Sequence, residues 1–204
     1  NQALYLDTLC LDYQLVPLDL TSHSFVLIDS MNTRKLVESK YNERQKEIET
    51  ASKLLSAKLA IAHLAEIKPE LLKTAKLALN NHKLFKRVKH VITENERVRQ
   101  TKSYLELDLL DEVGKLLTES HYSLKNDFNV SSKIMDDLVK MSIKAGALGA
   151  RMIGGGFGGS ILNLVKKENV TRYLAKFETL YQKKYQQNAK YSIVYPKDGL
   201  RQID

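Results

Sequence analysis

Cysteine and long apolar runs are what this chain of 204 residues has least of. The lone cysteine, Cys10, excludes a disulfide within the chain and a zinc site built from cysteines. We expect Cys10 to be a small buried residue, and without a visible signal peptide it favours a reducing cytoplasm. No apolar stretch approaches the roughly 20 residues of a membrane-spanning helix, so we expect no membrane partner.

Patterns for metal and nucleic-acid binding are also missing. The five histidines form no His-x-x-x-His pair, which argues against a metal site built from them. The formal net charge of +8 permits attraction to phosphate-bearing partners but does not choose among them. We interpret the basic segment "HKLFKRVKH" as the solvated face of a helix and expect no nucleic-acid partner. Its basic residues are Lys83, Lys86, Arg87, Lys89 and His90.

The order of apolar patterns along the chain predicts an α+β fold. Alternation or apolar runs predict strands at 3–9, 12–18, 25–28, 147–153, 160–165 and 191–195. Three-or-four spacing predicts helices at 41–67, from Pro69 onward, at 84–104, 105–120 and 132–145, and after Asn169. This order is typical of an antiparallel sheet covered by helices. Because the strand pattern begins almost at the first residue, which is not Met, the chain looks like part of a longer one.

The segment "RMIGGGFGGSILNLV" contains five of the nine glycines in six consecutive positions, between two apolar runs. Gly154, Gly156 and Gly159 match the dinucleotide-binding pattern, but that pattern requires a helix to follow, and Ile161 to Val165 are typical of a strand. No lysine followed by serine or threonine closes the run, which excludes a P-loop. Two interpretations stay open at this point. The loop is either a structural hairpin, or a place where bare backbone approaches a ligand.

Four blocks of the sequence resemble the galactokinase family, which is part of the superfamily of homoserine, mevalonate and phosphomevalonate kinases. "RMIGGGFGGS" resembles the family's Arg-Met-Thr-Gly-Ala-Gly-Phe-Gly-Gly-Cys, and "SKYNERQKE" resembles Tyr-Asn-x-Arg-Arg-x-Glu. "KHVITENERV" is similar to Arg-His-Val-x-x-Glu-Asn-x-Arg-Val, and "LLTESHYSLKNDFNVSS" to a Ser-His-x-Ser-Leu block. The blocks come in the family's order and span most of the chain.

This resemblance implies a fold, a cleft and ligands. The fold implied is the C-terminal domain of these kinases, an elaborated ferredoxin-like domain at 23–204, with 1–22 completing a sheet of the N-terminal half. The reaction implied is transfer of the ATP γ-phosphate, with Mg²⁺, to the anomeric hydroxyl of galactose. Tyr41 matches the family tyrosine that contacts galactose, although its position alone favours a half-buried aromatic at a helix start. The loop residues implied to line the cleft are Gly154, Gly155, Gly156, Phe157, Gly158 and Gly159.

The blocks that carry the catalytic chemistry of the resembled family do not occur in this sequence. These are a Gly-Glu-His-Thr-Asp block for the sugar, a Gly-Leu-Ser-Ser-Ser block for ATP and magnesium, and a Met-Asp-Gln aspartate. We therefore expect no catalytic residue within 1–204, no activity from the chain alone, and the N-terminal half of its own parent as its partner. Ile153 stands where the family has Thr, which motivates an alternative: a non-catalytic paralogue that senses sugar and ATP through a protein partner.

Overall fold

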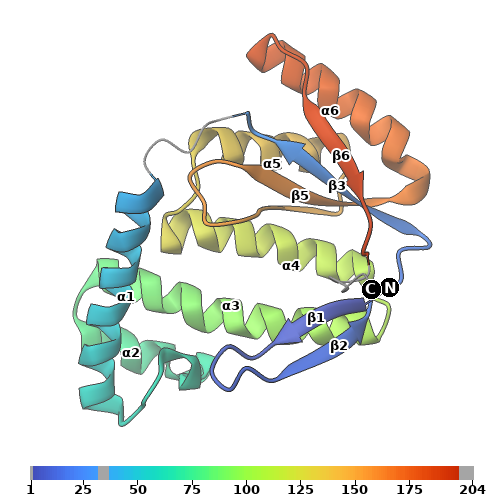
Figure 1. The fold of residues 1–204 in the computed structure, drawn as a ribbon. Helices are drawn as coiled ribbons and strands as arrows, with labels where there is room; N and C mark the ends of the chain where they lie inside the picture. Colours follow the sequence, from blue (N-terminus) through green and yellow to red (C-terminus); the bar gives the residue numbers. More distant parts are fainter. Residues whose placement is uncertain (1, 32–36, 198–204) are drawn as a thin grey trace, which may run out of the picture.

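The computed structural model describes residues 2–31 and 37–197 of the chain (Figure 1). Its strands are β1 (Gln2–Leu6), β2 (Tyr13–Pro17), β3 (His23–Asp29), β4 (Gly149–Met152), β5 (Ser160–Lys166) and β6 (Lys190–Val194). Its α-helices are α1 (Val37–Leu59), α2 (Leu72–Leu79), α3 (His82–Glu106), α4 (Leu110–Ser123), α5 (Lys133–Ala145) and α6 (Val170–Tyr185). Short 3₁₀ turns at Leu64–Glu66, Pro69–Leu71 and Lys167–Asn169, and a π-turn at Leu124–Phe128, join some of them.

An antiparallel sheet of four strands, in the order β4-β5-β3-β6, forms the centre of the molecule. Strand β3 pairs with β5 so that Ile28 lies opposite Ile161 and Phe25 opposite Leu164. Because successive side chains alternate between faces, these two pairs point to opposite sides of the sheet. The apolar runs that predicted strands here are therefore buried on both faces, and Ile28, Ile161 and Leu164 are all fully buried.

Helices cover both faces of this sheet, which confirms the α+β prediction (Figure 1). The face that carries Ile28 packs against α5 and α6, whose aromatic residues Tyr173 and Phe177 are almost fully buried. The other face packs through Leu164 against Leu110 and Val113 of α4. Beyond α4 lies α3, and a second apolar core of α1, α2 and α3 completes that side.

Helix α5 has the start and stop signals that the sequence predicted. The side-chain oxygen of Ser132 accepts a hydrogen bond from the Met135 amide, which satisfies one of the free amides of the first turn. Gly146 ends the helix in the left-handed conformation at φ 116°. The prediction of one helix over 41–67 was too long, since α1 ends at Leu59 and the next residue, Ala60, has φ 51°.

Strands β1 and β2 form a separate antiparallel hairpin that lies along α3 (Figure 1). Val16 is its buried residue, whereas Leu4, Leu15 and Tyr13 are more than half exposed. Cys10, in the turn between the two strands, is exposed, so the expectation of a buried cysteine was wrong. The alternating pattern identified the strands but not how much of the hairpin is covered. Of the helices within 37–197, none combines the length and the apolar character that crossing a membrane requires.

Candidate functional site

The glycine segment is a connection between two paired strands. Strand β4 pairs with β5 up to Met152 and Ile161, and the Ile153 amide extends the pairing through a 3.0 Å hydrogen bond to the Ser160 carbonyl. Between them Gly154, Gly156 and Gly159 have φ values of 80°, 90° and 94°, in the left-handed region that favours glycine. This confirms a turn rather than a helix start. Phe157 takes the same conformation at φ 60°, although it has a side chain.

The loop is held against the segment that precedes α5. The Phe157 amide donates a 2.8 Å hydrogen bond to the Val130 carbonyl. A Cβ added at Gly156 would lie 2.5 Å from that same oxygen, so the contact requires glycine. Gly155 differs, because nothing lies within 4 Å of an added Cβ there, and the resembled family pattern has alanine at this position.

A polar cavity of about 290 Å³ lies beside Phe157, and four distant parts of the sequence form its walls. Helix α1 contributes Glu43 and Arg44, helix α3 contributes Lys83 and Arg87, and the segment before α5 contributes Asn129 and Ser131. Three of the four sequence blocks that resemble the kinase family supply lining residues of this cavity. The fourth block, "KHVITENERV" at 89–98, lies in α3 but lines no part of this cavity.

Two carboxylates hold the cations of the cavity in place. Glu47 Oε2 accepts hydrogen bonds from Arg44 Nη1 at 2.5 Å and from Arg87 Nε at 2.7 Å, and all three side chains are buried. Lys83 Nζ lies 2.5 Å from Glu47 Oε1, and hydrogen bonds to Glu47 and Glu43 raise the pKa of Lys83. The hydrogen bonds from Lys83 and Arg44 in turn lower the pKa of Glu43. Three cations face two carboxylates, so the group has a net positive charge suited to an anion.

This network corrects the interpretation of "HKLFKRVKH" as a solvated face. Arg87 and His90 are buried, and Arg87 also donates a 2.5 Å hydrogen bond from Nη1 to the Asp127 carbonyl. Lys89 is paired with the Asp127 carboxylate at 2.8 Å, and the side chains of Lys83 and Lys89 are 57% and 44% exposed. The signal that could have predicted the network is the pair of acidic residues in "YNERQKE", since buried arginines require buried partners.

Tyr41 lies on α1 near the cavity but is not one of its lining residues. Its side chain is 57% exposed, so the expectation of a half-buried aromatic does not describe it. It precedes Arg44 by three residues, and residues three apart lie on the same face of a helix. Helix α1 therefore meets the glycine loop at this cavity, where Glu43 and Arg44 of the helix line the wall together with Phe157. Tyr41 itself stays accessible to solvent.

A buried histidine connects the strand before the loop to α5. His121 is fully buried, its Nδ1 accepts a 3.4 Å hydrogen bond from the Met152 amide, and its Nε2 lies 3.3 Å from Asp136 Oδ1. Burial lowers the pKa of His121, although Asp136 opposes this effect. Since Nδ1 accepts, the proton of the neutral ring lies on Nε2, facing the carboxylate. Asp136 also accepts from Ser131, which lines the cavity. The contacts of His121 thus link α4 to β4 and to α5.

Metal ligands are not assembled in the part of the chain that the structure describes. Within 2–31 and 37–197, no group of three or more histidine, cysteine, aspartate or glutamate side chains is placed to hold a metal ion. The carboxylates beside the glycine loop are instead neutralised by arginine and lysine.

Comparisons with known proteins agree with this architecture. Residues 101–182 match the family model described as GHMP kinases C terminal. Galactokinase of Enterococcus faecalis is 37% identical over 204 residues, which are 100% of this chain and 53% of the relative. Galactokinase of Limosilactobacillus reuteri is 34% identical over 200 residues, 98% of this chain and 51% of the relative. The chain thus spans about half the length of the curated relatives it matches.

The fold is also similar to solved structures. Galactokinase of Lactococcus lactis, solved in complex with galactose, superposes with a TM-score of 0.88 at 34% identity, over 94% of this chain and 50% of that one. Mevalonate kinase of L. major shares the fold alone, with a TM-score of 0.52 at 13% identity, over 87% of this chain and 44% of that one. Residues 101–182 thus match the GHMP kinase C-terminal domain, and the whole chain is similar in sequence and fold to a C-terminal portion of galactokinases.

Proposed function

We propose that the full-length protein containing this chain transfers the γ-phosphate of ATP to the anomeric hydroxyl of galactose. This chain would supply the C-terminal wall of the cleft. The observation that carries the proposal is that blocks resembling galactokinases meet at one place, where the glycine loop adjoins the cavity lined by Arg44, Lys83 and Arg87. The similarity to galactokinases over the whole chain supports the substrate assignment.

Phosphoryl transfer depends mainly on positioning and on stabilising negative charge. A loop of glycines lets the backbone approach a substrate more closely than side chains would allow. The buried guanidinium groups beside it provide a fixed positive field at no cost of reorganisation. Mg²⁺, when bound, would neutralise the phosphate charges, and we place its ligands, the phosphate-binding loop and the catalytic aspartate in parts of the protein outside this chain. We also propose a cytoplasmic location.

Tyr41 is proposed to contact the sugar rather than the nucleotide. Its exposure leaves both the ring and the hydroxyl available for packing and hydrogen bonding. In the full-length protein, Tyr41→Ala is expected to raise the KM for galactose and to leave the KM for ATP nearly unchanged. Exposed residues rarely contribute much to stability, so an unchanged melting temperature is the control. Equal effects on both KM values would contradict a sugar contact.

The hairpin of β1 and β2 is proposed to pack against the remainder of the parent protein, as part of a sheet that its N-terminal half completes. Leu4, Leu15 and Tyr13 form an exposed apolar set, and the described residues provide no cover for them. Leu15→Ala in the full-length protein is then expected to cost about 2 kcal/mol in the free energy of unfolding, as for a buried leucine. A cost below about 0.5 kcal/mol is the result for an exposed residue and would count against this packing.

A coupled assay with galactose, ATP and magnesium tests the proposed activity. The full-length protein is expected to turn over at about 1–100 per second, which is usual for kinases. Residues 1–204 alone are expected to show no turnover, because loss of positioning and charge stabilisation costs many orders of magnitude. Galactose binding by the full-length protein without turnover would contradict the kinase proposal and favour the sensor alternative.

A further inference from the structure

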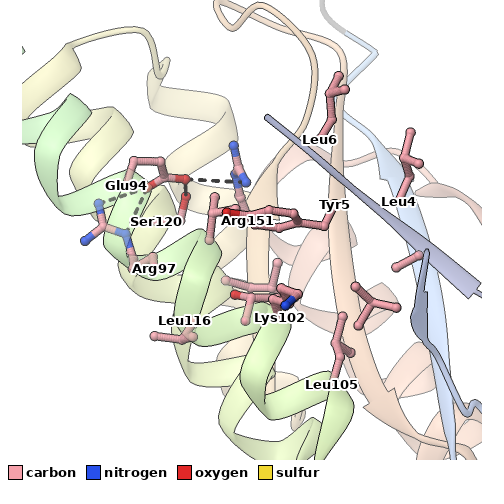
Figure 2. A pocket seen from close by; sticks show the side chains of 15 residues that line it. Leu4, Tyr5, Leu6, Glu94, Arg97, Lys102, Leu105, Leu116, Ser120 and Arg151 are labelled. Atoms are coloured by element: carbon pink, nitrogen blue, oxygen red, sulfur yellow. Dashed lines mark hydrogen bonds and ion pairs between the residues drawn. The ribbon is translucent and has the colours of Figure 1, made fainter. Parts of the chain in front are cut away.

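A second cavity, of about 380 Å³, lies between the β1–β2 hairpin and helices α3 and α4 (Figure 2). It shares no lining residue with the cavity beside the glycine loop. Its volume is within the range of small-molecule sites, which is about 300–1,000 Å³. Strand β4 connects the two places, because Arg151 lines the second cavity and Gly154 begins the loop three residues later.

Most of the wall of this cavity is apolar. The hairpin contributes Leu6 and Val16, helix α3 contributes Leu105, and helix α4 contributes Leu116 and Leu117. Figure 2 shows Leu6 and Leu105 across the cavity from Glu94 and Arg97. Such a wall suits an apolar body rather than a bare inorganic ion.

The charged end of the cavity is built around Glu94. Its carboxylate accepts a hydrogen bond from Ser120 and, at 2.8 Å, one from Arg97 Nε (Figure 2). Arg151 Nη1 lies 3.6 Å from Glu94 Oε1. Burial raises the pKa of Glu94, but Ser120, Arg151 and Arg97 together lower it below its usual value. Glu94 is therefore ionised, and two guanidinium groups face one carboxylate.

The excess positive charge at this end is not fully satisfied by the described residues. Arg151 Nε is buried and has no hydrogen-bond partner. A buried donor on a charged group costs free energy unless an acceptor reaches it. The neighbouring Lys102 is already balanced, since its Nζ lies 3.2 Å from Glu106 and 5.6 Å from the centre of the Tyr5 ring. The charge left over is one positive unit, between Arg97 and Arg151.

We propose that this cavity binds a small organic monoanion, a carboxylate on an apolar body, with the carboxylate against Arg151 and Arg97. The apolar walls of the hairpin, α3 and α4 enclose the body. The carboxylate neutralises the excess guanidinium charge and accepts hydrogen bonds from the accessible part of the Arg151 side chain, which is 36% exposed. The proposal does not depend on the kinase activity, since the site is separate from the glycine-loop cavity and is tested by binding alone.

The test is calorimetric titration of the full-length protein with octanoate, compared with octan-1-ol. Octanoate is expected to bind saturably with one site per chain, and the alcohol, which has the same apolar body without the charge, about tenfold or more weakly. Absence of saturable octanoate binding overturns the proposal. This holds also where the reason is that another part of the full-length protein covers the cavity. Equal affinity for the alcohol also overturns it.

Two variants locate the site. Arg151→Gln is expected to weaken octanoate binding about tenfold, whereas Arg99→Gln, on α3 but outside the cavity, leaves it unchanged. Thr101→Trp keeps both arginines and fills the cavity, so it is expected to abolish binding while the protein remains folded by circular dichroism. Octanoate binding that survives both Arg151→Gln and Thr101→Trp places the ligand elsewhere and overturns the assignment.

Discussion

The core between the four-stranded sheet and helices α5 and α6 differs from the core of α1, α2 and α3 in the polar side chains that it buries. The first is mainly apolar, with neutral polar side chains such as Ser142 and Asn163 buried in it, and its largest buried side chains include Tyr173, Phe177 and Ile28. The second is apolar in its middle, but where it meets the glycine loop it buries Glu47 with Arg44 and Arg87. Buried ion pairs contribute little stability compared with apolar packing.

The difference shows which part of the molecule is built for packing and which for presenting charge. An apolar core tolerates change in proportion to the volume lost. An ionic network fails more sharply, because removing one partner leaves the other charge buried and unpaired. The charged end of the helical core lies at the candidate site. Burying these charges lowers stability, but it places positive charge beside the glycine loop.

The largest effect is expected from Glu47→Ala, which leaves Arg44 and Arg87 buried without their shared carboxylate. The free energy of unfolding should fall by about 3–5 kcal/mol in urea denaturation. Glu43→Ala is the matched control, because Glu43 is half exposed and contacts Arg44 and Lys83 from the outside. A similar loss in both variants would show that burial of the network does not matter.

On the sheet side, Gly149→Ala should cost about 3 kcal/mol. A Cβ at Gly149 would lie 1.7 Å from the Gly114 carbonyl oxygen, so helix α4 and strand β4 would have to move apart. Thermal and chemical denaturation measure this loss. The control is Gly155→Ala, where an added Cβ meets nothing within 4 Å. A neutral Gly149→Ala would mean that α4 does not pack on β4 as closely as the structure shows.

Acid is expected to weaken the helical side through His90. Burial lowers the pKa of His90 from its ordinary value of 6.5 to about 4. Between these pH values the unfolded chain binds a proton at His90 and the folded protein does not. Stability from this residue is therefore complete above pH 6.5 and is lost as the pH falls toward 4, by up to about 3 kcal/mol. His90→Gln should remove this part of the slope in urea denaturation between pH 7 and 4. An unchanged slope would contradict the shift.

The smallest change in stability is expected at the loop. Gly156→Ala places a side chain at φ 90° and beside the Val130 carbonyl, which costs about 1 kcal/mol or more. Under the proposed function, the same variant should reduce turnover far more than this loss of stability explains. Gly155→Ala should preserve both properties. Normal turnover in Gly156→Ala would make the loop only a structural bend.

Much of the fold could be predicted from the sequence because local signals and tertiary packing agree. The apolar run at Phe25 to Ile28, the serine cap and the glycine stop of α5, and the strand after the glycine loop all form as expected. The early end of α1 and the exposure of Cys10 could not be predicted in this way. Both depend on where neighbouring elements are placed, which periodicity does not report.

The candidate site was predicted in part. The glycine turn followed from the strand pattern after it, and the positive φ values follow from the residue type. The cavity with Arg44, Lys83 and Arg87 did not, because charged residues at helical spacing are usually solvated. Only their distance from Glu47 in space explains why two of the three are buried.

The sequence by itself determined the order of strands and helices, the glycine turn and the family resemblance, since propensity, capping and alternation act over a few residues. The tertiary structure alone decided which charges meet. Arg87 reaches Glu47 across 40 positions, and Glu94 reaches Ser120 across 26. Such pairs are set by how helices pack, and the strength of an ion pair depends on distance and burial rather than on position along the chain.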